Sequence, residues 1–163
     1  MTKLKLLKKN KYGFYQVKKP PLSKDLNFYY KRKNYSKRNL ISYYEKDSKY
    51  YMFYLNLLLR WISNNTEFKI KKLIDIGCGV GHFLEAGNVN KISSLGLDIS
   101  EEIIKYLKQK KLKAEYYNLN ETAKKRSTDL LIVKNLLEHI ENPSKIINKI
   151  NKKFKYKYLL LST

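Results

Sequence analysis

The chain has 163 residues, of which 43% are hydrophobic, and it carries a formal net charge of +21. This length suits one domain with its own core, and the apolar content is too high for an intrinsically disordered chain. A single cysteine excludes an intramolecular disulfide framework and a zinc site built from several cysteines. We therefore predict no metal site.

The positive charge has two interpretations. It favours a polyanionic partner such as RNA, DNA or an anionic membrane, or it reflects the overuse of Lys, Asn, Ile and Tyr that an AT-rich genome produces without selection for binding. Nucleic-acid readers favour arginine, and only four of the 35 basic residues are arginines. Nucleic acid therefore stays an alternative partner that we do not favour.

No secretory signal or membrane span is expected. The first residues are basic but lack a long apolar core. The most apolar stretch runs from about Tyr50 to Ile62 and contains Asn56 and Arg60, whereas a transmembrane helix needs about 20 apolar residues. We expect a soluble, cytoplasmic protein.

Residues 1–65 are predicted to form a Lys- and Tyr-rich lead-in with helices. Residues 12–17 have the composition of a strand, and Ser23 is placed to cap a short helix after two prolines. Residues 44–63 are predicted to form a helix whose apolar residues lie on almost every side of it. We expect other parts of the protein, or a partner, to cover that helix.

Strands and helices alternate in the predicted core, residues 66–163. The predicted strands are residues 72–76, 92–99, 113–119, 129–133 and 156–162. The predicted helices are residues 82–86, 100–111 with Ser100 as the cap, and 143–151. This alternation predicts an α/β fold with a doubly wound, mostly parallel sheet.

Three glycines follow the first core strand in the sequence LIDIGCGVGHF, residues 73–83. Gly77 permits a tight turn, Gly79 lets a ligand approach the backbone, and Gly81 lets the next helix start close to the strand. We expect the backbone amides of this turn to face the crevice beyond the strand. His82 stands where a dinucleotide site has its third small residue, which counts against NAD and FAD, and no P-loop motif is present.

The pattern D-x-G-x-G-x-G, which begins at Asp75, resembles the class I S-adenosylmethionine-dependent methyltransferases. The resemblance continues with Asp98 in LGLDIS, Asn118 in YYNLNE and the segment DLLIVKNLLEHIENP, and it covers about residues 70–163. It implies a Rossmann-like core that binds S-adenosylmethionine. The stretch YGFYQVKKPPLSKDLNFYY is more faintly similar to the lead-in of methyltransferases found with surface-glycan and sugar-modifying enzymes.

The resemblance also implies where the cofactor lies. Asp75 would be near its methionine end, Asp98 would accept hydrogen bonds from both ribose hydroxyls, and Asn118 stands where the family often has Asp beside the adenine. The predicted cofactor-binding residues are Asp75, Gly77, Cys78, Gly79, Gly81, Asp98, Ile99, Asn118 and Leu119.

No catalytic base can be assigned from the sequence. Lys134 and Asn135 follow the fourth core strand and are predicted to point toward the crevice, as candidates for substrate contact. His139 in LLEHI is a candidate base, although a structural hydrogen bond is its favoured role. His82 is expected to pack or lie at the surface, with contact to the cofactor or substrate as the less favoured alternative. Asp129, at the opposite end of its strand, is expected to be structural.

Three functions remain open. The favoured one is methylation, most readily O-methylation, of a small molecule or glycan precursor. The second is RNA methylation with the help of the basic surface. The third is a truncated, non-catalytic remnant that binds the cofactor, because the family usually has seven strands and five are predicted here. An exposed last strand would then be covered by a partner or a second copy.

Overall fold

The computed structural model describes residues 7–9, 15–17, 46–120 and 125–163. Strands β1 (Leu7–Lys9) and β2 (Tyr15–Val17) form an antiparallel pair, and β2 lies within the strand predicted at residues 12–17. The helix predicted after Ser23 falls outside the described residues.

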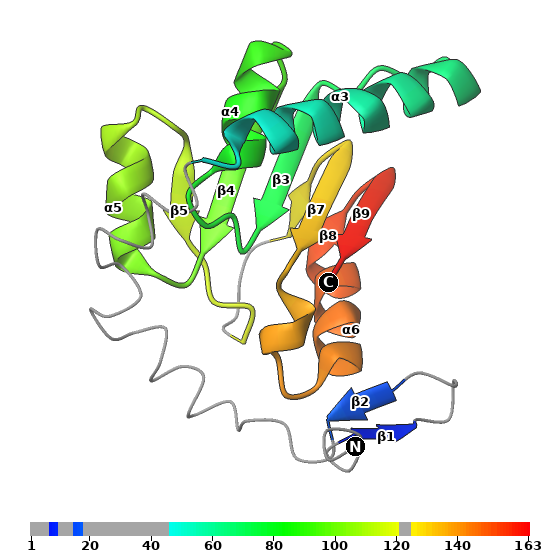
Figure 1. Cartoon of the computed structure of the whole chain (residues 1–163), viewed down its shortest axis with the longest axis vertical. Coiled ribbons are helices and arrows are strands. Elements are labelled where there is room, and N and C mark those ends of the chain that lie inside the picture. Colours follow the sequence, from blue (N-terminus) through cyan, green and yellow to red (C-terminus); the bar gives the residue numbers. More distant parts are fainter. Residues whose placement is uncertain (1–6, 10–14, 18–45, 121–124) are drawn as a thin grey trace.

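A five-stranded parallel sheet is the centre of the fold (Figure 1). The strand order is β5-β4-β3-β7-β9. The chain adds strands on one side of β3 as far as β5 and then adds β7 and β9 on its other side, so the strand order reverses between β3 and β7. The strands are β3 (Lys72–Ile76), β4 (Ser93–Asp98), β5 (Ala114–Tyr116), β7 (Leu130–Lys134) and β9 (Tyr158–Ser162). The predicted α/β fold with a doubly wound parallel sheet is confirmed.

The bounds of β4, β5, β7 and β9 differ from the prediction by one to three residues, and β9 begins at Tyr158 instead of residue 156. Strand β5 ends at Tyr116 instead of residue 119, because Asn118 Oδ1 accepts a hydrogen bond from the amide of Asn120 (2.9 Å) and turns the chain. A second small parallel pair, β6 (Arg126–Ser127) with β8 (Phe154–Lys155), was not predicted.

The core helices begin at the predicted residues, and Ser100 is the cap that the sequence predicts. Ser100 accepts a hydrogen bond from the Ile103 amide at the start of α5, and Asn142 caps α6 one residue before the predicted start. The helices are α3 (Ser48–Asn65), α4 (His82–Val89), α5 (Glu101–Gln109) and α6 (Pro143–Lys153), and a 3-10 turn, η2 (Leu137–His139), follows β7. Within the described part of the chain, no helix combines the length and apolarity needed to cross a bilayer.

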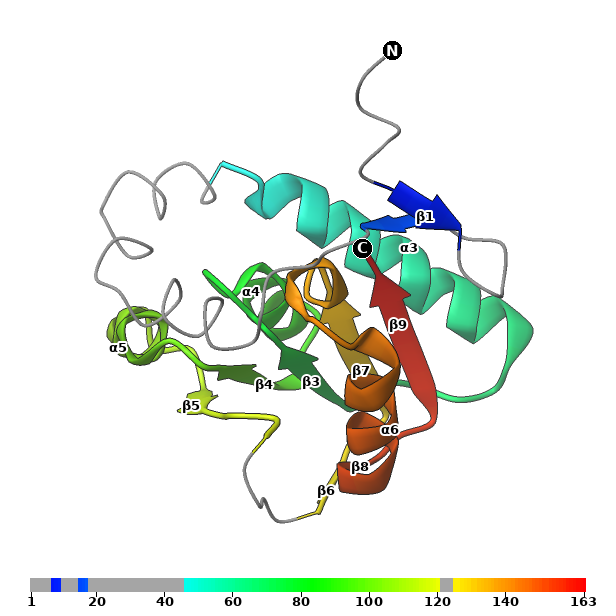
Figure 2. The same cartoon turned by 90° about the horizontal axis from the view of Figure 1, so that it is seen from below.

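Helices cover both faces of the sheet (Figure 2). Helices α3, α4 and α5 pack on the face that carries Leu73 and Ile132, and α6 packs on the face that carries Ile74 and Leu131. The strands are therefore buried on both sides, as expected of a parallel sheet. One side of helix α3 packs on the rest of the fold. On another side, four large apolar residues are more than half exposed, so the expected covering of this helix is only partial: Tyr50, Phe53, Leu57 and Trp61.

Asp129 forms hydrogen bonds at the end of the sheet that lies opposite the glycine turn. Its Oδ2 accepts hydrogen bonds from the amides of Lys71 (2.8 Å) and Lys72 (3.0 Å), where β3 begins. These contacts satisfy two backbone donors at the strand end. The predicted structural role of Asp129 is confirmed.

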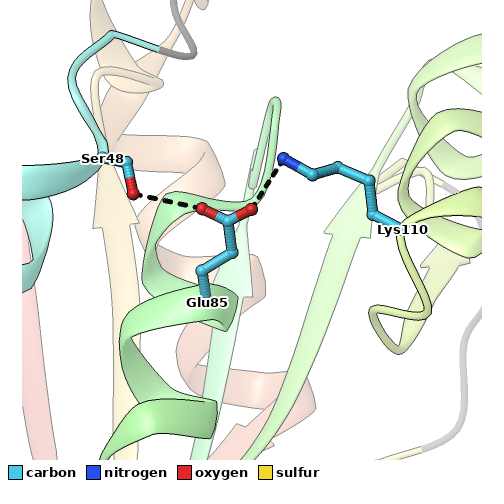
Figure 3. Close-up of polar contacts among 3 residues, drawn as sticks. All are labelled: Ser48, Glu85 and Lys110. Carbon is cyan, nitrogen blue, oxygen red and sulfur yellow. Dashed lines mark hydrogen bonds and ion pairs between the residues drawn. The ribbon is translucent and has the colours of Figure 1, made fainter.

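Glu85 of α4 connects three helices (Figure 3). Its Oε2 accepts a hydrogen bond from Ser48 Oγ of α3 (3.3 Å), and its Oε1 lies 2.7 Å from Lys110 Nζ at the end of α5. Burial alone would lower the pKa of Lys110, but the hydrogen bond and the charge of Glu85 raise that pKa above its ordinary value. Glu85 therefore holds α3, which covers the sheet, in place relative to α4.

Glu85→Gln is expected to lower the free energy of unfolding by about 0.5–1 kcal/mol, because a partly exposed ion pair is lost. Urea denaturation at low salt measures the loss. Glu67→Gln is the matched control, since Glu67 is an exposed acid in the loop after α3. Equal effects of the two substitutions would show that the contact between helices contributes nothing.

Candidate functional site

The turn after β3 takes a backbone conformation that requires its glycines. Gly77, Gly79 and Gly81 have φ angles of 75°, 50° and 86°, in the left-handed region that side chains disfavour. A Cβ atom on Gly81 would lie 2.5 Å from a methyl of Leu107, whereas one on Gly79 would meet nothing within 4 Å. The absence of a side chain at Gly81 thus allows the start of α4 to pack closely against Leu107. At Gly79 it leaves open space above the backbone.

The amides of this turn are used inside the protein. The amides of Gly77 and Cys78 both donate to the carbonyl of Leu97 in β4 (2.7 and 3.3 Å), and the amide of Gly81 donates to the carbonyl of Cys78 (3.0 Å). The expectation that the amides face the crevice is therefore wrong for Gly77, Cys78 and Gly81, because these amides bond to β4 or within the turn. Such a turn presents bare backbone to a ligand and is no cradle for a phosphate.

The carboxylate of Asp98 points at the glycine turn from the end of β4. Its Oδ2 accepts a hydrogen bond from the Gly79 amide (3.1 Å), and its Oδ1 accepts one from the Ser100 amide (2.9 Å). Burial raises the pKa of Asp98, and these backbone hydrogen bonds partly offset the rise. A carboxylate has about four acceptor sites, so Asp98 is fixed in orientation and keeps capacity for further donors.

A first cavity of about 370 Å³ opens at the carboxyl ends of β3, β4 and β7. This is the point where the strand order reverses, the usual place for a ligand in an open α/β sheet. Six of the predicted cofactor-binding residues line it: Gly77, Gly79, Asp98, Ile99, Asn118 and Leu119.

A second cavity of about 340 Å³ adjoins the first. The two cavities share Gly77, Gly79, Asn135 and His139. Asn135 itself has a φ of 52°, a left-handed conformation that Asn tolerates better than most residues. Asp75, Cys78 and Lys134 also line the second cavity.

Gly81 lines neither cavity, although it was predicted to bind the cofactor. Its Cα faces Leu107 and Leu112, which leave no room for a Cβ. The D-x-G-x-G-x-G spacing predicted the turn correctly. It could not show that Gly77 and Gly79 line the cavities whereas Gly81 packs against leucine side chains.

Asp75 is a buried acid beneath the second cavity. Its burial and, to a smaller extent, the charge of Asp98 raise the pKa of Asp75 from 3.8 to about 8, and the charge of Lys134 only partly opposes this rise. The side chain is 3% exposed. This raised pKa favours the protonated, neutral carboxyl group in the folded protein at neutral pH.

Aromatic rings form one wall of the second cavity. The ring of Tyr51 in α3 stacks on that of His82 with a centroid distance of 4.7 Å, and Phe83 packs edge-on against Tyr51 at 5.0 Å. Lys134 Nζ lies 5.4 Å from the centre of the Tyr51 ring. His82 is buried in this stack and also lines the second cavity, so its predicted packing role stays a prediction.

Several lining residues were missed by sequence reasoning. The apolar pattern of residues 44–63 predicted a covered helix but could not show that Tyr51 reaches the cavity. Tyr117 and Lys145 line the first cavity, and Glu138 lines the second. No local motif marks them, since each is placed by the packing of distant elements. Among the described residues, no group of three or more His, Cys, Asp or Glu side chains is placed to hold a metal ion.

A family model described as a methyltransferase domain matches residues 36–163, most of the chain. The chain belongs to this methyltransferase-domain family. A search of curated protein sequences gives no match.

Solved structures show the same fold at low sequence identity. The plantazolicin methyltransferase BpumL, solved with a desmethylPZN analogue and SAH, has a TM-score of 0.60 and 18% identity, over 81% of this chain and 56% of that one. The magnesium protoporphyrin IX methyltransferase ChlM from Synechocystis PCC 6803, solved with SAH, has a TM-score of 0.58 and 18% identity. The match covers 82% of this chain and 68% of that one. This methyltransferase-domain chain thus spans little more than half the length of BpumL.

Asp75→Asn is expected to stabilise the folded methyltransferase domain increasingly as the pH rises from 4 to 8. In this window the unfolded chain has lost the Asp75 proton while the folded protein keeps it, so the stability of the unsubstituted protein falls with pH. The fall is at most about 1.4 kcal/mol per pH unit. Asn mimics the protonated acid and removes this contribution.

Urea denaturation at pH 5 and pH 8 measures the difference, and Glu138→Gln, an exposed acid on the same cavity, is the control. An Asp75→Asn protein whose stability changes with pH as steeply as that of the unsubstituted protein would contradict the neutral state of Asp75.

Proposed function

We propose that the chain is an S-adenosylmethionine-dependent methyltransferase. The observation that carries this proposal is the contact between Asp98 and the amide of Gly79, next to the open space above Gly79. An acid held beside bare backbone suits a ribose laid against the turn. The internal use of the turn's amides also fits a cofactor that has no phosphate.

The first cavity suits the adenosyl part of the cofactor. The unused acceptor capacity of Asp98 would take hydrogen bonds from the ribose hydroxyls. Ile99 and Leu119 supply apolar walls for a flat base, and Asn118 adds an amide at the end of β5. The chemistry that the bound cofactor supplies is an electrophilic methyl group on a sulfonium.

The second cavity suits the methionine end and the methyl acceptor. The cationic ammonium and sulfonium favour the ionised form of a nearby acid, so Asp75 would lose its proton when they bind. Asn135 and His139 line both cavities, which places them where donor and acceptor meet. Orientation at this junction is the chain's main contribution, and we propose His139 as the candidate base.

We propose a small molecule or a glycan precursor as the acceptor, methylated on oxygen. The volume of about 340 Å³ supports a small acceptor, since cavities of this size hold small molecules. RNA as the acceptor, and binding without catalysis, are the alternatives that an assay separates.

Gly79→Ala is expected to weaken S-adenosylhomocysteine binding at least tenfold, because the new methyl fills the space above the backbone. Its cost to folding is limited to the strain of a positive φ, about 1–2 kcal/mol. Gly81→Ala is the matched control, whose methyl meets Leu107 and should lower stability more while the folded fraction still binds. Calorimetric titration and thermal denaturation report the two effects, and unchanged binding by Gly79→Ala would contradict the proposed site.

A methyl-transfer assay tests the activity itself. Labelled S-adenosylmethionine is supplied with a panel of sugars, nucleotide sugars, small acids and bulk RNA, and label on a small acceptor is the expected result. Label that appears only on RNA, with a rate that falls steeply with salt, would favour the RNA alternative. Cofactor binding without transfer to any acceptor would favour a non-catalytic chain.

A further inference from the structure

The second cavity contains a lysine that forms no ion pair with the described carboxylates. Lys134 Nζ donates a hydrogen bond to Asn135 Oδ1 (3.1 Å) and lies over the Tyr51 ring. Among the described residues, no carboxylate lies within ion-pair distance of this nitrogen. The side chain is only half-exposed, so its charge is less well hydrated than that of a surface lysine.

None of the other ionisable groups of this cavity lies within ion-pair distance of Lys134, although its charge acts on the buried Asp75. Before a cofactor binds, burial raises the pKa of Asp75 to about 8, which favours its neutral form at neutral pH. Glu138 is exposed at the rim, where water screens its charge. His82 is buried in the stack with Tyr51, and His139 is exposed. The cavity therefore offers one fixed positive charge to whatever enters it.

The wall beneath this charge is aromatic and apolar. Tyr51, His82 and Phe83 form the stacked cluster, and Val80 and Ile103 complete it. None of these five residues lines the first cavity. A planar ring packs well against such a surface, and an anionic substituent on the ring would then lie near Lys134 Nζ, where charge strengthens a hydrogen bond.

We propose that Lys134 binds an anionic group, such as a carboxylate, carried by the methyl acceptor, while Tyr51 of α3 supports the rest of that molecule. This assignment rests on the proposed function, because the cavity receives an acceptor only if the chain transfers methyl groups. The carboxylate of the cofactor's methionine end has the same chemistry. The acceptor is favoured because Lys134 lies against Tyr51, in the part of the second cavity that is separate from the first.

Benzoate and benzamide are probes that share a ring and a size but differ in charge. Each is titrated by NMR into the full chain, with and without saturating S-adenosylhomocysteine. The unsubstituted protein should bind benzoate at least fivefold more tightly than benzamide. Lys134→Gln should lose that preference, and Lys105→Gln, an exposed lysine on α5, should keep it. Equal binding of the two probes, or a preference that survives Lys134→Gln, would overturn the proposal.

A second arm separates the acceptor from the cofactor. S-adenosylhomocysteine and its decarboxylated analogue are titrated into both proteins, and thermal denaturation verifies that Lys134→Gln is folded. Little change in either affinity is the expected result. A tenfold loss for S-adenosylhomocysteine with no loss for the analogue would assign Lys134 to the cofactor and overturn the proposal. If the unsubstituted protein binds benzoate selectively but no S-adenosylhomocysteine, the proposed function fails and the anion site stands.

Discussion

The hydrogen bond between the Gly79 amide and the Asp98 carboxylate organises the candidate site. It joins the turn after β3 to the end of β4, and the amides of Gly77 and Cys78 reinforce the junction through the carbonyl of Leu97. Because these donors are satisfied within the protein, the turn keeps its shape without a ligand. The turn needs three alternate positions, Gly77, Gly79 and Gly81, in the left-handed conformation that most side chains disfavour.

The distribution of charge follows from this arrangement. Asp75 is buried and Asp98 is partly buried on neighbouring strands, and desolvation raises the pKa of each. Asp98 has backbone donors that favour its ionised form, whereas Lys134 is the main favourable charge near Asp75. The site is thus prepared for a ligand with hydroxyl donors at one end and positive charge at the other, which matches the cofactor that we propose.

The sequence predicted those parts of the fold that depend on local signals. The strand at residues 72–76, the Ser100 cap and the order of elements were predicted because burial pattern, capping chemistry and glycine spacing are local. The early end of β5 depends on one Asn118 hydrogen bond, and the direction of the turn amides depends on contact with β4. Tyr51 reaches the site only through the packing of α3 on α4, which no pattern within α3 encodes.

A crystal structure of the chain with S-adenosylhomocysteine tests the central claim most directly. The account predicts that the ribose lies over Gly79, with both hydroxyls within hydrogen-bond distance of the Asp98 carboxylate. A ligand bound elsewhere, or a ribose whose hydroxyls do not contact Asp98, would contradict it.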